Sequence, residues 1–322
     1  MAKKTMTLFK NNSTMKQYAG LILIIALMLF GFSFSNENFF TFTNLIAIVK
    51  QASIYGIVGL GTCILSINAE QDISVGVIVA AAGTALTMAN RAGMGLIPCI
   101  LIDILVGVLL GTLNGVGVAL TGMSSYIFTM ATTNIYRGLT YIISGGQPIP
   151  FCPDGLKWLG QGMLGNVIPV AVVFMLIIYA IGYIFMNYTS LGRRFYARGG
   201  NEVAAKYAGI NIRKTVILSY MICGFLCSLA ALVMTGKFAS SQPTMGNGLD
   251  VDAIACAAIG GIGMDGGTGS VLGVLLGAII IGIINNGMVM IGFDSYWQIV
   301  AKGVIIIVAV SVDIYRKKLM DR

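Results

Sequence analysis

The sequence contains no histidine and very little charge. Without an imidazole, the chain can supply neither a histidine general base nor a histidine-held metal that activates water. No Ser–Lys or paired-Asp arrangement stands out either, so an enzyme is the least favoured functional class. Only 10% of the 322 residues are charged, whereas a soluble domain carries about 25%. A water-exposed surface of ordinary extent therefore cannot be built from this sequence.

The sequence also lacks the phosphate-binding loop of an ATPase. The stretch "MTGKF" at 234–238 has no first glycine and no Ser or Thr after the lysine. If this chain moves a solute uphill, the energy must come from an ion gradient or from another polypeptide. The six cysteines lie mostly in apolar runs, so we expect them to be small buried hydrophobic residues and expect no metal site.

Apolar residues are abundant, at 57% of the total, and they gather in long runs. About 20 helical residues, each rising about 1.5 Å, cross a hydrocarbon core about 30 Å thick. The runs predict an all-α, polytopic integral membrane helical bundle with about ten transmembrane helices. The expected spans are 18–34, 45–67, 73–90, 97–118, 125–143, 167–186, 215–235, 251–262, 271–290 and 297–313.

Glycine is also abundant, with 42 residues. Gly107, Gly111 and Gly115 recur at intervals of four, as do Gly273 and Gly277. Small residues at this spacing let helix backbones approach closely in lipid, where no hydrophobic force drives helices together. We therefore expect tight helix packing along these rows.

The net charge of +8 is distributed unevenly. Basic residues cluster near both chain ends and within 193–214, the pattern typical of cytoplasmic segments. This distribution argues for membrane topology and against a nucleic-acid partner. We expect one transmembrane domain over 1–322 with both termini cytoplasmic. Its expected parts outside the membrane are a cytoplasmic tail at 1–17, an outer loop at 144–166, a cytoplasmic loop at 187–214 and a cytoplasmic tail at 314–322.

One charged stretch, "LGRRFYARGGNEVAAKYAGI" at 191–210, interrupts the apolar runs. Asn201 is a good N-cap, Glu202 favours the positive end of a helix, and Gly209 offers a left-handed stop. The pattern predicts a short helix at 202–208. Because isolated helices of this length are marginal in water, it needs a surface to pack on. The stretch is either a topology-setting basic loop or a docking helix for a cytoplasmic partner.

Several motifs together resemble one family. The segment "TSLGRRFYARGGNEVAAKYAGI" is similar to T-x-x-G-R-x-x-x-A-x-G-x-N-x-x-A-A-x-x-x-G-I, and "LDVDAIACAAIGGIGMDGGTGS" is similar to E-L-x-A-I-A-A-x-x-x-G-G-x-x-x-x-G-G-x-G. "GTLNGVGVA" and "YRGLTYIISGGQPI" match the middle of the first half. From about residue 18 to 315, the chain resembles the permease subunit of monosaccharide-type, ribose-permease-like ABC importers.

The resemblance implies a set of partners and a location. It implies cytoplasmic ATPase subunits, an extracytoplasmic solute-binding protein and a second permease copy, identical or not, in the bacterial plasma (inner) membrane. No cofactor is expected in this chain, since the ATPase subunits use the ATP. The coupling loop at 187–214 is where those subunits would dock. The positions expected to couple to the ATPase are Gly192, Arg193, Arg194, Asn201, Ala204, Ala205 and Gly209.

The chain departs from the family at "AEQDISVG", residues 69–76, where G-G-I-D-L-S-V-G is typical. Glu70 adds a second carboxylate beside Asp72. We expect a broken helix here, which is tolerated at membrane depth only where it is buried in protein or lines a cavity. An ordinary short cytoplasmic turn is the alternative. The candidate pathway-lining residues are Glu70, Asp72, Ser74, Asn114, Arg137 and Asn286, although the two asparagines could instead join helices by hydrogen bonds.

Ionisable residues inside spans cost on the order of 2.5–3.5 kcal/mol each and are functional hypotheses by default. We expect Lys50 and Lys302 to extend to the membrane interface, and Asp103 and Arg137 to be buried against partners. Asp252 lies near the end of a span, where a cap or turn would explain it.

Two transport mechanisms remain open from the residues alone. The favoured one is a passive permease driven by docked ATPases, which imports a small sugar or sugar-like solute. The alternative is an ion-coupled secondary transporter that uses Glu70 and Asp72 as coupling carboxylates. The sequence does not identify the solute, and it leaves the helix boundaries near 68–95 and 250–270 open.

Overall fold

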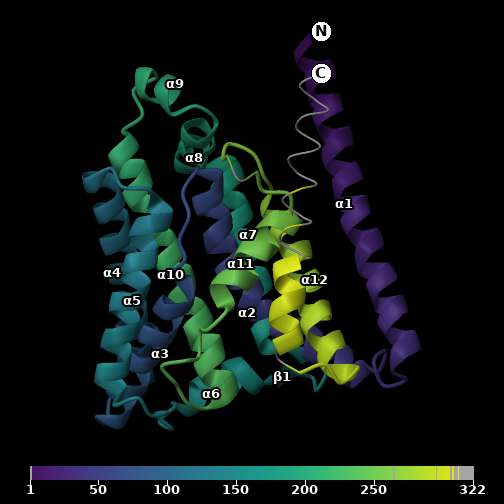
Figure 1. Cartoon of the computed structure of the whole chain (residues 1–322), viewed down its shortest axis with the longest axis vertical. Helices are drawn as coiled ribbons and strands as arrows, with labels where there is room; N and C mark the ends of the chain where they lie inside the picture. The colour runs from purple at the N-terminus through teal and green to yellow at the C-terminus, as the bar shows by residue number, and fades with distance from the viewer. Residues whose placement is uncertain (1, 264, 295, 305–306, 308–310, 312–322) are drawn as a thin grey trace.

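The computed structural model describes residues 2–263, 265–294, 296–304, 307 and 311, with only the backbone for 2–14, 16 and 17. Within this part, the chain is a bundle of helices with one two-stranded antiparallel sheet (Figure 1). The predicted all-α class is confirmed. The elements are α1 (Ala2–Ser35), α2 (Phe42–Ile67), α3 (Val75–Arg91), α4 (Leu96–Thr121), α5 (Ser125–Ser144), α6 (Asp154–Gln161), β1 (Met163–Leu164), β2 (Ile168–Pro169), α7 (Val170–Tyr188), α8 (Ser190–Gly200), α9 (Glu202–Tyr207), α10 (Ile212–Phe238), α11 (Leu249–Ile259) and α12 (Val271–Met290).

Six helices of the described chain are long and apolar enough to cross a membrane: α1, α2, α4, α7, α10 and α12. This confirms a polytopic membrane protein. The helix α3, with 17 residues, is shorter. The helix α11 has 11 residues and rises only about 16 Å at 1.5 Å per residue, so it cannot cross alone. The last expected span, 297–313, lies partly outside the described residues, which are helical over 296–304.

The helix α10 packs closely on α4 through the predicted glycine row. A methyl group added at Gly111 would lie 2.5 Å from the Tyr220 carbonyl oxygen and 2.9 Å from the Gly224 Cα. A methyl group at Gly107 would likewise clash with the Gly224 carbonyl. The close approach of these two helices therefore depends on glycine, as the spacing predicts.

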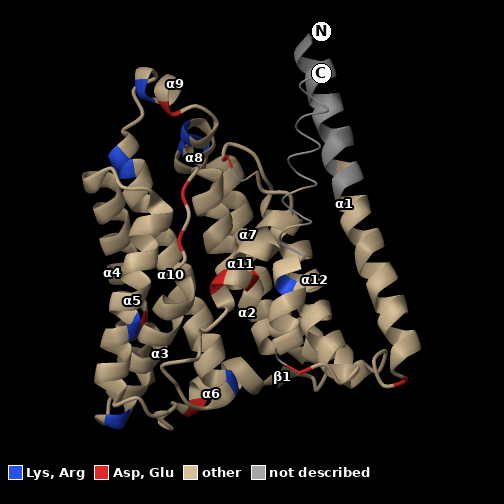
Figure 2. Cartoon of the chain, in the orientation of Figure 1, with Lys and Arg blue, Asp and Glu red and all other residues tan. Residues whose placement is uncertain are grey.

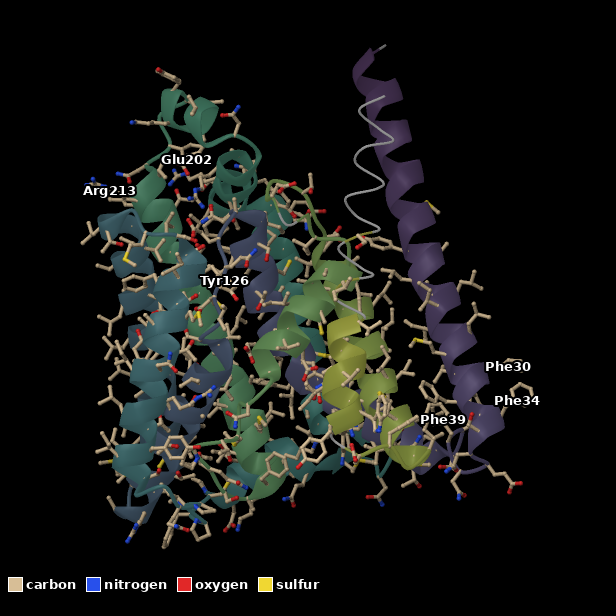
Figure 3. The ribbon with its side chains drawn as sticks, in the orientation of Figure 1. Phe30, Phe34, Phe39, Tyr126, Glu202 and Arg213 are labelled. Carbon is tan, nitrogen blue, oxygen red and sulfur yellow. The ribbon has the colours of Figure 1, made fainter. Side chains whose placement is uncertain are left out.

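Apolar side chains cover much of the outer surface, as expected of a bundle surrounded by lipid. On α1, Phe30 and Phe34 point away from the other helices (Figure 3). In the turn between α1 and α2, Phe39 points inward and is fully buried. Charged side chains lie mainly at the two ends of the bundle, with a smaller number inside it (Figure 2).

The beginning of α1 and the helices α8 and α9 lie at one end of the bundle, and α6 and β1 lie at the other (Figure 1). At the first end lie Glu202 of α9 and Arg213 in the first turn of α10 (Figure 3). The segment 187–214 was expected to be largely a loop with one short helix. Instead, a second helix, α8, precedes α9, because Thr189 caps it by accepting a hydrogen bond from the Gly192 amide at 3.1 Å.

Candidate functional site

The helix break predicted near residue 70 is present between α2 and α3. Ala69 has φ +55°, in the left-handed region that glycine favours, and the resembling family has glycine there. The helix α3 begins at Val75. We call residues 68–74 the linker. Because Glu70 and Asp72 are both almost fully buried, the linker is not an ordinary exposed turn.

The Asp72 carboxylate is held by neighbours on two elements. Its Oδ1 accepts hydrogen bonds from the Ser74 amide at 2.7 Å and from the Ser74 hydroxyl at 2.6 Å. Asn114 of α4 donates to the Ser74 hydroxyl at 2.7 Å and to Asp72 Oδ2 at 3.4 Å. Tyr136 of α5 donates to Asn114 Oδ1 at 2.9 Å. The structure therefore brings together Asp72, Ser74 and Asn114, three of the predicted pathway residues.

Surrounding helices satisfy the linker backbone. The Gln71 amide donates to Ser125 at 3.2 Å, and the Ile73 amide donates to Thr129 at 3.3 Å. The Tyr220 hydroxyl of α10 donates to the Gln71 carbonyl at 2.7 Å. Non-helical backbone at membrane depth needs such protein partners, so the linker is built as a stable feature.

A small cavity lies beside the linker, between α2 and α11. Its polar lining is Thr62, Ser66, Gln71 and Asp72, and its apolar lining is Ile254, Ala257, Ala258 and Ile262. The Thr62 hydroxyl is buried and has no hydrogen-bond partner among the described residues. The cavity volume of about 10 Å³ has room for about one water molecule and is too small for a sugar. Of the predicted pathway residues, Asp72 lines this cavity.

Glu70 has a different environment from Asp72. Its Oε1 lies 2.6 Å from Arg198 Nη2 of α8, and Arg198 also contacts Glu202 at 3.0 Å. Arg198 Nη1 donates to the carbonyl of Asn68. Burial raises the pKa of Glu70, and the Arg198 guanidinium opposes this shift. Arg198 was not among the predicted coupling positions, although its i,i+4 spacing from Glu202 indicates a local ion pair.

The other two predicted pathway residues lie apart from this network. Asn286 of α12 donates to Asn44 Oδ1 of α2 at 2.9 Å, which fits the helix-joining alternative. Arg137 is half-buried on α5, and its Nε has no hydrogen-bond partner among the described residues.

The predicted coupling positions form the two short helices α8 and α9. Asn201 caps α9 through the Ala204 amide at 2.9 Å, and Gly209 has φ +82°, as the sequence indicates. Gly192 packs against the carbonyl of Met186, where a Cβ would clash. Exposed coupling positions are Arg193, Arg194, Asn201, Ala204 and Gly209, whereas Ala205 is buried.

The exposed face of α9 has an apolar character. Val203 and Tyr207 are separated by four residues and therefore share this face. Their exposed fractions are 65% and 88%. Both side chains are therefore free to contact a partner.

Four charged residues of the spans can be compared with expectation. Lys302 was expected to extend to the membrane interface, but its Nζ lies 2.8 Å from Asp252 Oδ1. That expectation is wrong because the buried Asp252 carboxylate requires a counter-charge; Asp252 is thus more than a cap. Lys50 is on the outside of the bundle and donates to the Gln161 carbonyl. Asp103 is fully buried, but neither carboxylate oxygen has a hydrogen-bond partner among the described residues, contrary to the expected pairing.

Comparison with known proteins gives extensive matches. Residues 44–309 match the family model described as "Branched-chain amino acid transport system / permease component". The ribose import permease protein of Haemophilus influenzae is 35% identical over 93% of both chains. The D-allose transport system permease protein of Escherichia coli is 36% identical over 91% of this chain and 89% of its own.

A third relative is a probable ABC transporter permease protein of Escherichia coli, 33% identical over 92% of this chain and 89% of its own. The chain matches no solved structure. These relatives do not favour the ion-coupled secondary transporter. The chain belongs to the family of branched-chain amino acid transport system permease components, and it is a multi-pass permease subunit of an ABC importer in the bacterial inner membrane.

Proposed function

We propose that this permease imports a sugar or a sugar-like, hydroxyl-rich solute, driven by separate ATPase subunits that dock on α8 and α9. Two relatives support this solute class, since one is a ribose import permease and the other is a D-allose transport system permease.

The observation that carries ATPase docking is the exposed face of α9. Tyr207 is 88% exposed at the end of the bundle, and a tyrosine so placed is typical of an interaction site. A helix of six residues needs an external surface to stabilise it fully. The exposed Arg193 and Arg194 can pair with carboxylates on the same partner.

The same proposal gives the membrane arrangement and the assembly. The chain forms a single transmembrane domain over 1–322 with about ten spans. Both termini and the 187–214 segment lie in the cytoplasm, and the 144–166 segment lies outside. Two permease copies form one pathway and receive the solute from an extracytoplasmic binding protein. ATP is used by the ATPase subunits, and this chain needs no cofactor.

Docking is tested by replacing Tyr207 with Asp. The complex is purified through a tag on the permease, and the amount of ATPase retained is measured. We expect Y207D to reduce the retained ATPase by about tenfold, the scale of losing one aromatic hot-spot residue. The control is Tyr296→Asp, which changes another exposed tyrosine, 78% exposed, beyond α12. Equal retention in both variants would contradict docking on α9.

The solute class is tested separately by uptake into membrane vesicles that contain the complete transporter and ATP. Labelled D-ribose, D-allose and L-leucine distinguish the sugar relatives from the amino-acid description of the family model. We expect uptake of a sugar and none of leucine. ATP-dependent uptake of leucine alone would overturn the proposed solute class.

A further inference from the structure

The Arg198 side chain joins the start of α9 to the linker, which lies about 130 residues earlier in the chain. It extends from the end of α8 and is buried, with 9% of its surface exposed. Its guanidinium contacts Glu70 at 2.6 Å, Glu202 at 3.0 Å, and the carbonyl of Asn68. One planar group therefore connects the proposed ATPase-docking helix α9 with the linker.

The charge arrangement makes this connection tight. Glu70 is 5% exposed, and a buried carboxylate is stable only when a counter-charge and hydrogen bonds compensate for its lost hydration. Among the described residues, its ion pair is with Arg198. The second carboxylate, Glu202, has a side chain that is 55% exposed. The buried Glu70 thus fixes Arg198 to the linker, and the more exposed Glu202 fixes it to α9.

The backbone is also packed closely at this junction. A Cβ at Gly199 would clash with the carbonyl of Ile67, the last residue of α2. The Gly267 amide donates to that same carbonyl at 2.8 Å. Because side-chain and backbone contacts coincide, α8 cannot move away from the end of α2 without breaking the ion pair and the packing together.

The linker leads directly to the cavity. Asp72 follows Glu70 by two residues and lines the cavity, whereas Glu70 does not. The Glu70 carboxylate is directed to Arg198 and is not part of the cavity lining. The extra carboxylate that distinguishes this chain from its family therefore has a partner in the coupling segment.

We propose that Arg198 and Glu70 are a pair of positioning residues that transmit movement of α8 and α9 to the linker, and through it to Asp72. This inference rests on the proposed docking of ATPase subunits on α8 and α9. Glu70 then serves neither as a solute ligand nor as an ion-coupling carboxylate. When the ATPases move α9, the buried ion pair carries the linker with it.

The test uses the complete transporter in proteoliposomes, and it compares Glu70→Gln with Asp154→Asn. The control Asp154 lies in an exposed ion pair with Lys157 at 2.7 Å on α6, so its loss should have little effect. Three quantities are measured: ATPase retained by the permease, ATP hydrolysed, and solute imported per ATP. For E70Q we expect full retention of the ATPase and about a tenfold fall in solute imported per ATP, the scale of a typical coupling free energy.

Exchanging the two charges distinguishes loss of the Glu70–Arg198 ion pair from local damage to the structure. Glu70→Arg and Arg198→Glu are combined in a Glu202→Gln background, so that the new carboxylate does not face Glu202. The Glu202→Gln variant alone is the reference. We expect each single exchange to lose coupling and the combined exchange to recover most of the solute imported per ATP.

Three outcomes would overturn the inference. A parallel fall in hydrolysis and import, with their ratio unchanged, would show a structural role only. A change in the solute concentration for half-maximal import, without rescue by the exchange, would make Glu70 a solute ligand. An unchanged ratio in E70Q would show that the pair transmits nothing. Failure of the unmodified permease to retain an ATPase would instead contradict the proposed function itself.

Discussion

Asn114 on α4 donates a hydrogen bond of 2.7 Å to the hydroxyl of Ser74, the residue that precedes α3. Ser74 in turn donates to Asp72 at 2.6 Å, and Tyr136 fixes the Asn114 carbonyl oxygen. A row of buried hydrogen bonds thus holds the linker against two other helices. The position of the Asp72 carboxylate beside the cavity follows from this row.

Replacing Asn114 with Leu should destabilise the permease by about 1–3 kcal/mol, because Ser74 and Tyr136 lose a buried partner. The midpoint of thermal unfolding of the detergent-solubilised permease measures this effect. The control is Asn134→Leu, which changes an exposed amide on α5 that bonds within its own helix. If both variants unfold at the same temperature as the unmodified protein, the hydrogen bonds around Asn114 do not stabilise the linker.

Replacing Asp72 with Asn should reduce transport more than assembly. The amide oxygen of Asn can still accept from Ser74, so the linker should keep its shape, but the charge beside the cavity is lost. We expect import to fall by about tenfold or more, on the scale of removing a hydrogen bond to a charged group, with the ATPase still retained. Import and retention are measured on the same preparation. Equal losses in both would reduce Asp72 to a folding role.

The glycine row gives a matched pair of substitutions. Gly111→Ala should destabilise the bundle by about 1–3 kcal/mol, the usual cost of overpacking, because the new methyl group meets the backbone of α10. Gly138→Ala on α5 adds the same methyl group where no atom lies within 4 Å, and it should be neutral or stabilising. The Gly111→Ala variant should therefore unfold at a lower temperature than the Gly138→Ala variant. The reverse order would contradict the packing of α4 on α10.

Much of this arrangement could be predicted from the sequence. The apolar runs predicted the positions of the long helices, and the glycine spacing predicted close packing along α4 but not that α10 is its partner. Local sequence signals were sufficient to predict α9, because Asn201 caps its start and Gly209 ends it within the adjoining turns. The partners of charged side chains were not predictable, because these contacts join residues far apart in the chain. Lys302 with Asp252 and Arg198 with Glu70 are both of this kind.

The Lys302–Asp252 pair can be tested by removing one charge at a time. Lys302→Met leaves the Asp252 carboxylate, 5% exposed, without its partner and should cost about 3–5 kcal/mol. Adding Asp252→Asn should recover part of this loss, because no unpaired buried charge remains. The matched control is Lys157→Met, which breaks an exposed ion pair on α6 and should cost less than about 1 kcal/mol. Identical unfolding of both lysine variants would contradict a buried pair.

The central claim is that this permease has no energy source of its own and is driven by ATPases bound at α8 and α9. Solute accumulation in proteoliposomes, with ionophores present to remove every ion gradient, tests it most directly. We predict accumulation when the ATPase subunits, the binding protein and ATP on the α8–α9 side are all supplied, and none when the ATPase is omitted. In a parallel sample without ionophores and without the ATPase, accumulation driven by an imposed ion gradient would contradict the account.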